Sequence, residues 1–220
     1  DFGPRTLTNL IKSGVDRHRI THILFSHFHA DHFADFIPFF FDAVIYCKYQ
    51  GGQRPPLTLI GPRGTATLMR AMMTTFPSFD RPPFRVTIRE VSDRSFRLGD
   101  TRIRPATVKH APRLHCVGYR IEYQDHVVAY SGDSLYCGSL VKLCRDADVA
   151  ILDCSFPENE PGAGHLHAGE CGRVAQEAGI DRLVLSHFYP IAEQYDVRAQ
   201  AASYFSGRVR MAKDLLLVTG

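Results

Sequence analysis

The side chains best suited to chemistry in this sequence lie in one short run. His27, His29, Asp31 and His32 form an HxHxDH pattern over residues 27–32, which places four potential metal ligands in six positions. Imidazole nitrogens and carboxylate oxygens are the donors that zinc and related divalent ions bind. A histidine-rich polar loop that holds no ion is the alternative, because short motifs also arise by chance.

The residues before this run predict a buried strand that aims the first two histidines. Residues 20–26 are mostly β-branched or apolar and lack helical periodicity. In an extended chain, residues two apart point to the same side. We therefore expect His27 and His29 to hold one ion together.

The other two ligands of the run suit a second ion. Asp31 and His32 fall in the turn that begins a helix predicted over residues 33–46, so they face away from the first pair. Two-metal hydrolytic sites hold their ions about 3.5–4 Å apart. Such a site needs further ligands from elsewhere in the chain.

Histidine and aspartate recur after three further predicted strands, at positions 110, 133 and 187. Each residue has an ordinary explanation by itself: a buried structural histidine, or for Asp133 the N-cap of a helix over 135–144. The joint pattern favours ligands. We assign His27, His29 and His110 to a first ion and Asp31, His32 and His187 to a second, with Asp133 bridging both.

These segments resemble the metallo-β-lactamase superfamily, and within it the ribonuclease Z-like group. The motifs are SHFHADH at 26–32, GPRGT at 61–65, VKHA with GYRIE at 108–122, YSGDS at 130–134 and LSHFYP at 185–190. The resemblance implies a mixed α/β fold, a four-layer αββα sandwich, and a single hydrolase domain over residues 1–220. Because relatives place two strands before the motif that begins at Asp1, we expect the N-terminal strands to be absent from this chain.

A second stretch, residues 148–174, is similar to the part of ribonuclease Z relatives where a histidine opens a helix and donates a proton near the scissile phosphate. His167 matches that place better than His165, because an amphipathic helix over 168–178 follows it directly. An ordinary first-turn helix residue is the alternative for His167. Asp153, at a strand end, matches an acidic residue that supports this histidine.

The resemblance implies a dinuclear metal-dependent hydrolase, most simply a phosphodiesterase that attacks with a hydroxide bridging two ions. Asp31 would orient or deprotonate this nucleophile, and His167 would protonate the leaving oxygen. Zn²⁺ is the first choice of metal, and Mn²⁺ also suits mixed histidine and carboxylate ligands. Tyr119, Arg120 and Asp153 are predicted substrate contacts.

Two substrate classes remain as alternatives, an RNA 3′ end and a small cyclic phosphate. Transfer RNA-trimming relatives carry a long arm between the GYR segment and the Gly-Asp ligand, where this chain has only a tight turn at residues 124–125. The net charge of +3 is modest, and no Lys/Arg block predicts a nucleic-acid surface. The chain also resembles the phosphonate-pathway cyclic phosphodiesterase. A lactone or thioester hydrolase with the same metals is the alternative, and a non-catalytic member of the fold is a third.

Composition fits a globular catalytic domain, with 45% hydrophobic and 22% charged residues. The six cysteines lack a short-spaced framework or a CxxC pair, so we expect free thiols and no cysteine-bound structural zinc. The sequence shows no signal peptide and no apolar run of 18 residues, which favours a cytoplasmic location without a membrane partner. A homodimer stays open.

The remaining periodicity predicts alternating strands and helices. Helices are expected at 33–46, 63–75, 135–145, 168–178 and about 195–205, and strands at 57–60, 84–91, 102–108, 117–123, 127–131, 148–153, 182–186, 208–210 and 214–218. Five phenylalanines crowd the first helix, at positions 33, 36, 39, 40 and 41. Most should be core, with a partly exposed aromatic rim as the alternative.

Overall fold

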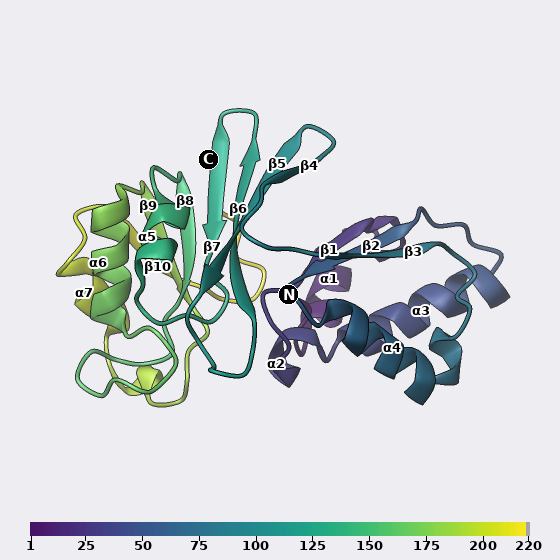
Figure 1. Cartoon of the computed structure of the whole chain (residues 1–220). Coiled ribbons are helices and arrows are strands. Elements are labelled where there is room, and N and C mark those ends of the chain that lie inside the picture. Colours follow the sequence, from purple (N-terminus) through teal and green to yellow (C-terminus); the bar gives the residue numbers. More distant parts are fainter. Residues whose placement is uncertain (219–220) are drawn as a thin grey trace. The chain divides into compact units, whose positions relative to one another are not determined.

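The computed structural model, which describes residues 1–218, contains two β-sheets, one in each of two units of the chain. Unit 1 spans Asp1–Val91 and unit 2 spans Ser92–Gly220. Figure 1 shows unit 1 in purple to blue and unit 2 in teal to yellow. Each unit has its own buried apolar cluster, so each is described separately.

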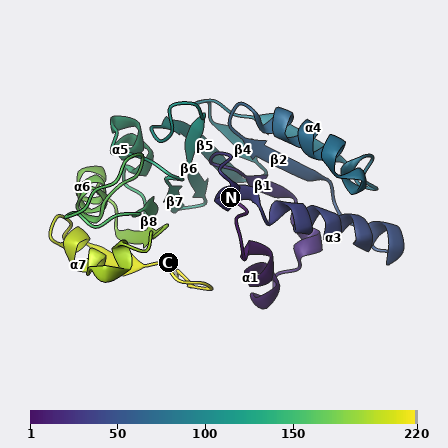
Figure 2. The ribbon, with the colours of Figure 1, turned by 90° about the horizontal axis from the view of Figure 1, so that it is seen from below.

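Unit 1 is built on a parallel three-stranded sheet with the strand order β1-β2-β3. Ile23, Leu59 and Ile88 lie in register across it. Both strand-to-strand connections advance in the same direction, so right-handed crossovers place their helices, α3 and α4, on one face. Figure 2 shows α3 between α1 and α4. The elements are α1 (Thr6–Lys12), η1 (Arg17–Arg19), β1 (His22–Leu24), α2 (Ala30–Phe33), α3 (Phe36–Tyr49), β2 (Leu57–Gly61), α4 (Thr65–Thr75), η2 (Pro77–Phe79) and β3 (Val86–Glu90).

Unit 2 is built on a seven-stranded mixed sheet with the strand order β10-β9-β8-β7-β6-β5-β4. Strands β4 to β7 pair antiparallel, and β7 to β10 pair parallel. The three parallel connections run through α5, α6 and α7 and all advance the same way. Right-handed crossovers therefore put these helices on one face of the sheet, as Figures 1 and 2 show. The elements are β4 (Phe96–Leu98), β5 (Thr101–Val108), β6 (Cys116–Tyr123), β7 (His126–Tyr130), α5 (Gly138–Cys144), β8 (Val149–Asp153), α6 (Ala168–Ala178), β9 (Arg182–Ser186), α7 (Val197–Ala202) and β10 (Arg208–Met211).

This topology brings the ligand candidates of unit 2 to one edge of its sheet. β5 runs in the same direction as β7, because both are antiparallel to β6, and β8 and β9 are parallel to β7. The carboxyl ends of all four strands therefore meet at the same edge. Beyond or at these ends lie His110, Asp133, Asp153 and His187. Crevices at such edges are the usual ligand sites of open α/β sheets.

Most of the predicted elements occur, and α6 and β9 have the predicted bounds. The helix predicted over 33–46 is instead two helices, α2 and α3, that meet at Ala34 and Asp35. Pro38 explains the interruption, because it has no N–H to donate to the Ala34 carbonyl and its ring would collide with that group in a continuous helix. The short helix α1 and the short strand β4 were not predicted.

The strand predicted over 214–218 is wrong. The Leu216 N–H donates to the Lys213 carbonyl at 3.0 Å, and Leu215 has a φ of 62°. A turn with a left-handed residue cannot continue as an extended strand. The expectation that the phenylalanines of α3 are mostly core is confirmed: Phe36, Phe39 and Phe40 are buried, whereas Phe41 is 48% exposed.

The expectation of free thiols is confirmed. All six cysteines are free thiols, and five of them are buried. Burial raises the pKa of the Cys144 thiol to about 12, as expected of an inert core thiol. Among the helices described for residues 1–218, none is both long and apolar enough to cross a membrane.

Candidate active site

In unit 1, the HxHxDH run forms two pairs of ligand atoms. His27 is fully buried, and its Nε2 lies 3.0 Å from Nδ1 of His29. Asp31 and His32 lie on α2, and the His32 Nε2 is 3.4 Å from the Asp31 Oδ2. Donor atoms about 2.0–2.1 Å from a tetrahedral zinc ion lie about 3.3 Å from each other. Each pair therefore has a spacing that suits two ligands of one ion.

Asp1 supports this run from outside it. Its Oδ1 accepts a hydrogen bond from the Ser26 N–H at 2.6 Å, and its Oδ2 lies 2.8 Å from Nδ1 of His32. A carboxylate on Nδ1 fixes the tautomer and leaves Nε2 as the ligand atom. Gly3 allows this approach, because a Cβ there would lie 1.8 Å from the Asp31 carbonyl oxygen. Asp1 is not predicted as a site residue from the sequence, where only its Asp-Phe-Gly context offers a signal.

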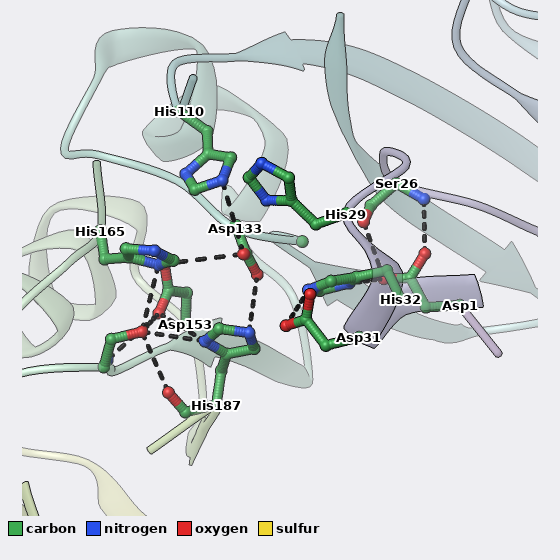
Figure 3. A network of polar contacts seen from close by, with 12 residues as sticks. Asp1, Ser26, His29, Asp31, His32, His110, Asp133, Asp153, His165 and His187 are labelled. Atoms are coloured by element: carbon green, nitrogen blue, oxygen red, sulfur yellow. Dashed lines mark hydrogen bonds and ion pairs between the residues drawn. The ribbon is translucent and has the colours of Figure 1, made fainter. Parts of the chain in front are cut away.

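In unit 2, Asp133 lies between two histidines, as Figure 3 shows. Its Oδ2 is 3.6 Å from the His110 Nε2, and its Oδ1 is 3.4 Å from the His187 Nε2. The carboxylate is 2% exposed. Its two oxygens thus face different histidines at the spacing of ligands that could share an ion.

Backbone and hydroxyl groups hold both histidines in this orientation. The His110 Nδ1 lies 2.6 Å from the Gly164 carbonyl oxygen. The His187 Nδ1 lies 2.9 Å from the Ser155 hydroxyl. His187 also has a φ of 61°, a backbone conformation that costs a non-glycine residue roughly 1–3 kcal/mol.

A buried acid–histidine pair lies directly beside Asp133. The Asp153 Oδ2 is 2.8 Å from Nδ1 of His165, which is 8% exposed. The His165 ring stacks on His187 with 5.3 Å between ring centroids. Asp153, His165 and His187 are close enough to hold an ion themselves. We assign no separate ion to this group, because the Nδ1 atoms of both histidines already face hydrogen-bond partners and the His187 Nε2 faces Asp133.

His167 has a different environment from His165. It is the N-cap of α6, where its Nδ1 accepts a hydrogen bond from the Glu170 N–H at 3.4 Å. The Glu170 carboxylate in turn accepts from the His167 N–H at 3.2 Å, completing a capping box. The structure thus places His165, rather than His167, against Asp153 and His187. The catalytic role of His167 stays a prediction.

Two predicted substrate contacts, Tyr119 and Arg120, make structural contacts within unit 2. Tyr119 is 1% exposed, and burial raises the pKa of its phenol far above the ordinary value. Arg120 donates to Glu122 at 2.7 Å and to the carbonyl oxygens of Leu143 and Arg145 at the end of α5. Their positions on β6 give them packing and capping roles in place of the predicted contact with substrate.

A family model described as the beta-lactamase superfamily domain matches residues 4–188. The chain belongs to this superfamily. The match includes all the histidines and aspartates described above except Asp1. The metallo-β-lactamase resemblance and the hydrolase class predicted from the sequence are therefore confirmed, as is metal binding as the family's chemistry.

Curated relatives of this superfamily member include a probable metallo-hydrolase, YhfI of Bacillus subtilis (strain 168). It is 28% identical over 218 residues, which cover 97% of this chain and 84% of the relative. A ribonuclease Z of Mycobacterium sp. (strain KMS) is 27% identical over 248 residues, covering 98% and 83%. Both alignments span nearly the whole chain.

Solved structures show the same fold. The crystal structure of Bacillus subtilis YhfI, described as a metallo-beta-lactamase fold protein, has a TM-score of 0.81 at 27% identity and covers 97% of this chain and 83% of YhfI. Human tRNase Z, short form, has a TM-score of 0.77 at 20% identity, covering 100% and 86%. A diphosphatase from the PhnP family has a TM-score of 0.75 at 18% identity, covering 100% and 79%. The predicted mixed α/β, metallo-β-lactamase fold class is confirmed.

Proposed function

We propose that this chain is a dinuclear metal-dependent phosphodiesterase. The observation that carries the proposal is Asp133, whose two oxygens face two different histidines. The names of the relatives support the reaction class, since ribonuclease Z recurs among them.

The donor set fits two divalent ions. One ion would take His27, His29 and His110, the other would take Asp31, His32 and His187, and Asp133 would bridge them. All are imidazole or carboxylate donors, which suit Zn²⁺ first and Mn²⁺ second. When bound, such ions lower the pKa of a water and neutralise charge on phosphoryl oxygens.

The chain's own residues would orient the nucleophile and move the leaving-group proton. Asp31 has a side chain that is 56% exposed, so its carboxylate can reach a water and accept its proton. For the leaving oxygen there are two candidates: His167 from the sequence resemblance and His165 from its contacts. We favour His165, because Asp153 occupies its Nδ1 and thereby leaves Nε2 to carry the proton.

The substrate is either RNA or a small cyclic phosphodiester. Gln124 and Asp125 alone join β6 to β7, and Gln124 has a φ of 53° that fits a tight hairpin turn. The place where transfer RNA-trimming relatives carry an arm is therefore a two-residue turn. This supports small substrates at least as well as precursor tRNA.

Purified protein with measured metal content tests the reaction class. We expect turnover of bis(p-nitrophenyl) phosphate and of either a cyclic nucleotide or a precursor tRNA, and none of an acyl lactone. Lactone turnover without any phosphodiester turnover would overturn the proposal in favour of a lactone or thioester hydrolase.

A matched pair of variants identifies the proton donor. His165→Ala should keep its metal and lose about 10²- to 10⁴-fold in kcat, the usual contribution of a general acid. His167→Ala should keep both metal and most of its turnover, because its ring caps α6. The opposite result, with turnover lost only in His167→Ala, would return the role to His167.

A further inference from the structure

Two aromatic side chains lie beside the histidines of unit 2 and have no role in the chemistry above. The rings of Phe156 and Tyr189 meet edge to face at 5.1 Å between centroids. Tyr189 lies 5.2 Å from the His165 ring and 5.7 Å from the His187 ring, and Phe156 lies 6.0 Å from His165. We call Phe156 and Tyr189 the aromatic pair.

The aromatic pair is partly exposed rather than core. Tyr189 is 39% exposed and Phe156 is half-buried, whereas the neighbouring Phe188 packs against the buried cluster of unit 2. Partly exposed aromatic rings that lie beside a candidate site can contact a ligand bound there.

Backbone contacts hold the aromatic pair in place. The Tyr189 N–H donates to the Ser155 carbonyl at 3.2 Å, and the Phe156 carbonyl accepts from the Ala168 N–H at 3.0 Å. Phe156 also lies on the backbone of Gly162, where a Cβ would be 2.1 Å from the ring. The two rings therefore form a preorganised surface, which lowers the entropic cost of binding.

Tyr189 also marks where a leaving group would lie. Its phenol oxygen is 3.3 Å from the His165 Nε2. The other ring nitrogen of His165 faces Asp153, so Nε2 is the atom at which a leaving oxygen would be met. A group attached to that oxygen would lie against the Tyr189 ring.

We propose that the aromatic pair is a binding subsite for a nucleobase on the leaving side of the scissile phosphate. Aromatic side chains can stack on any of the nucleobases, because every base has a planar face. A sugar phosphate without a base offers no such face. The inference rests on the proposed phosphodiesterase function and narrows its substrates to nucleotide-type phosphodiesters.

Two substrates with the same reacting group test the subsite. Adenosine 2′,3′-cyclic phosphate carries a base, and 1-O-methylribose 2,3-cyclic phosphate does not. We expect kcat/KM for the adenosine compound to be higher by about 5- to 100-fold, the range of one stacked base. Tyr189→Leu and Phe156→Leu should each reduce this ratio severalfold, and Tyr189→Phe, which keeps the ring, should preserve it.

Tyr123→Leu is the matched control, because Tyr123 is 47% exposed at the far end of β6. It should leave the ratio unchanged. No preference in the natural protein, or a ratio that survives both leucine variants, would overturn the subsite.

A binding measurement separates this result from the reaction class. Titration calorimetry of the zinc-loaded protein with adenosine 5′-monophosphate and with ribose 5-phosphate compares a ligand with and without a base. If no phosphodiester is hydrolysed, the proposed function fails. The subsite is supported only by tighter adenosine binding that Tyr189→Leu removes, and equal affinity for the two ligands overturns it.

Discussion

A single hydroxyl, that of Ser155, contacts three polar side chains of the candidate site in unit 2. It lies 2.6 Å from the Asp153 Oδ1, 3.1 Å from the His165 Nδ1 and 2.9 Å from the His187 Nδ1. A serine hydroxyl donates one hydrogen bond and accepts two. It can therefore fix the carboxylate and orient both rings at once, which makes Ser155 a positioning residue for a metal ligand and for the favoured proton donor.

Replacing Ser155 should weaken metal binding without unfolding the chain. Groups that orient a metal-binding histidine typically contribute 10- to 100-fold to affinity, so Ser155→Ala should lose about that factor for zinc, measured by competition with a chelator. Ser155→Thr, which keeps the hydroxyl, should recover part of it. Ser134→Ala is the control, because the Ser134 hydroxyl is buried nearby but donates to the Leu135 carbonyl. Equal zinc affinity in the two alanine variants would contradict the role of Ser155.

Asp1 should act in the same way on unit 1. Without a carboxylate at its Nδ1, the His32 ring can rotate or change tautomer. Asp1→Ala should therefore weaken zinc binding by about 10- to 100-fold in the same competition assay. Asp35→Ala removes a carboxylate that accepts from the Leu7 N–H instead. If that variant loses as much zinc affinity as Asp1→Ala, the effect reflects general damage to unit 1.

At the residue scale, local spacing was enough to propose the HxHxDH run as metal ligands. Asp1 could not be found this way, because it meets His32 across 31 positions of sequence. Ser155 meets His187 across 32 positions. His165 and His167 differ by two positions in one loop, so only the contacts of Asp153 distinguish them. A residue that reaches a metal-binding side chain only after the chain folds leaves no pattern in the local sequence.

The strands are the elements that decide which ligand candidates meet. Apolar runs predicted β5, β7, β8 and β9. Because the predicted strands end just before or at histidine or aspartate, they also placed these residues at strand ends. Strand order did not follow from the sequence, because pairing depends on contacts between distant segments. The short strand β4 has one buried residue, Phe96, and too little alternation to be detected.

An ion-pair cluster links β5 and β6 at the end away from His110. Burial alone would raise the pKa of Glu122, but the hydrogen bond from Arg120 and the charges of Arg104 and Arg102 lower it below its ordinary value. A carboxyl whose pKa is lower in the folded state stabilises the fold above its unfolded pKa of about 4.3. That stabilisation disappears as pH falls through the lower, folded-state pKa.

Glu122→Gln should therefore destabilise the protein in a pH-dependent way. The free energy of unfolding in urea should be lower than that of the natural protein at pH 7. The difference should shrink from pH 4.3 downward, where the natural carboxyl also becomes neutral. A difference that stays constant down to pH 3 would show that Glu122 acts through packing rather than charge.

At the scale of the whole molecule, the sequence predicted the fold class because two independent patterns agreed. Alternating strands and helices indicated a mixed α/β protein, and the ligand motifs resembled one superfamily. The family match over residues 4–188 confirms both. The substrate could not be predicted in the same way, because superfamily ligands serve several reactions and substrate choice depends on surfaces such as the aromatic pair.

Metal content measures most directly whether Asp133 holds two ions together. The natural protein and its variants can be loaded with zinc, desalted and analysed by plasma mass spectrometry. We expect two zinc ions per chain in the natural protein and loss of both in Asp133→Ala. His110→Ala and His187→Ala should each weaken one ion. Two bound ions in a folded Asp133→Ala protein would contradict the bridging role of Asp133.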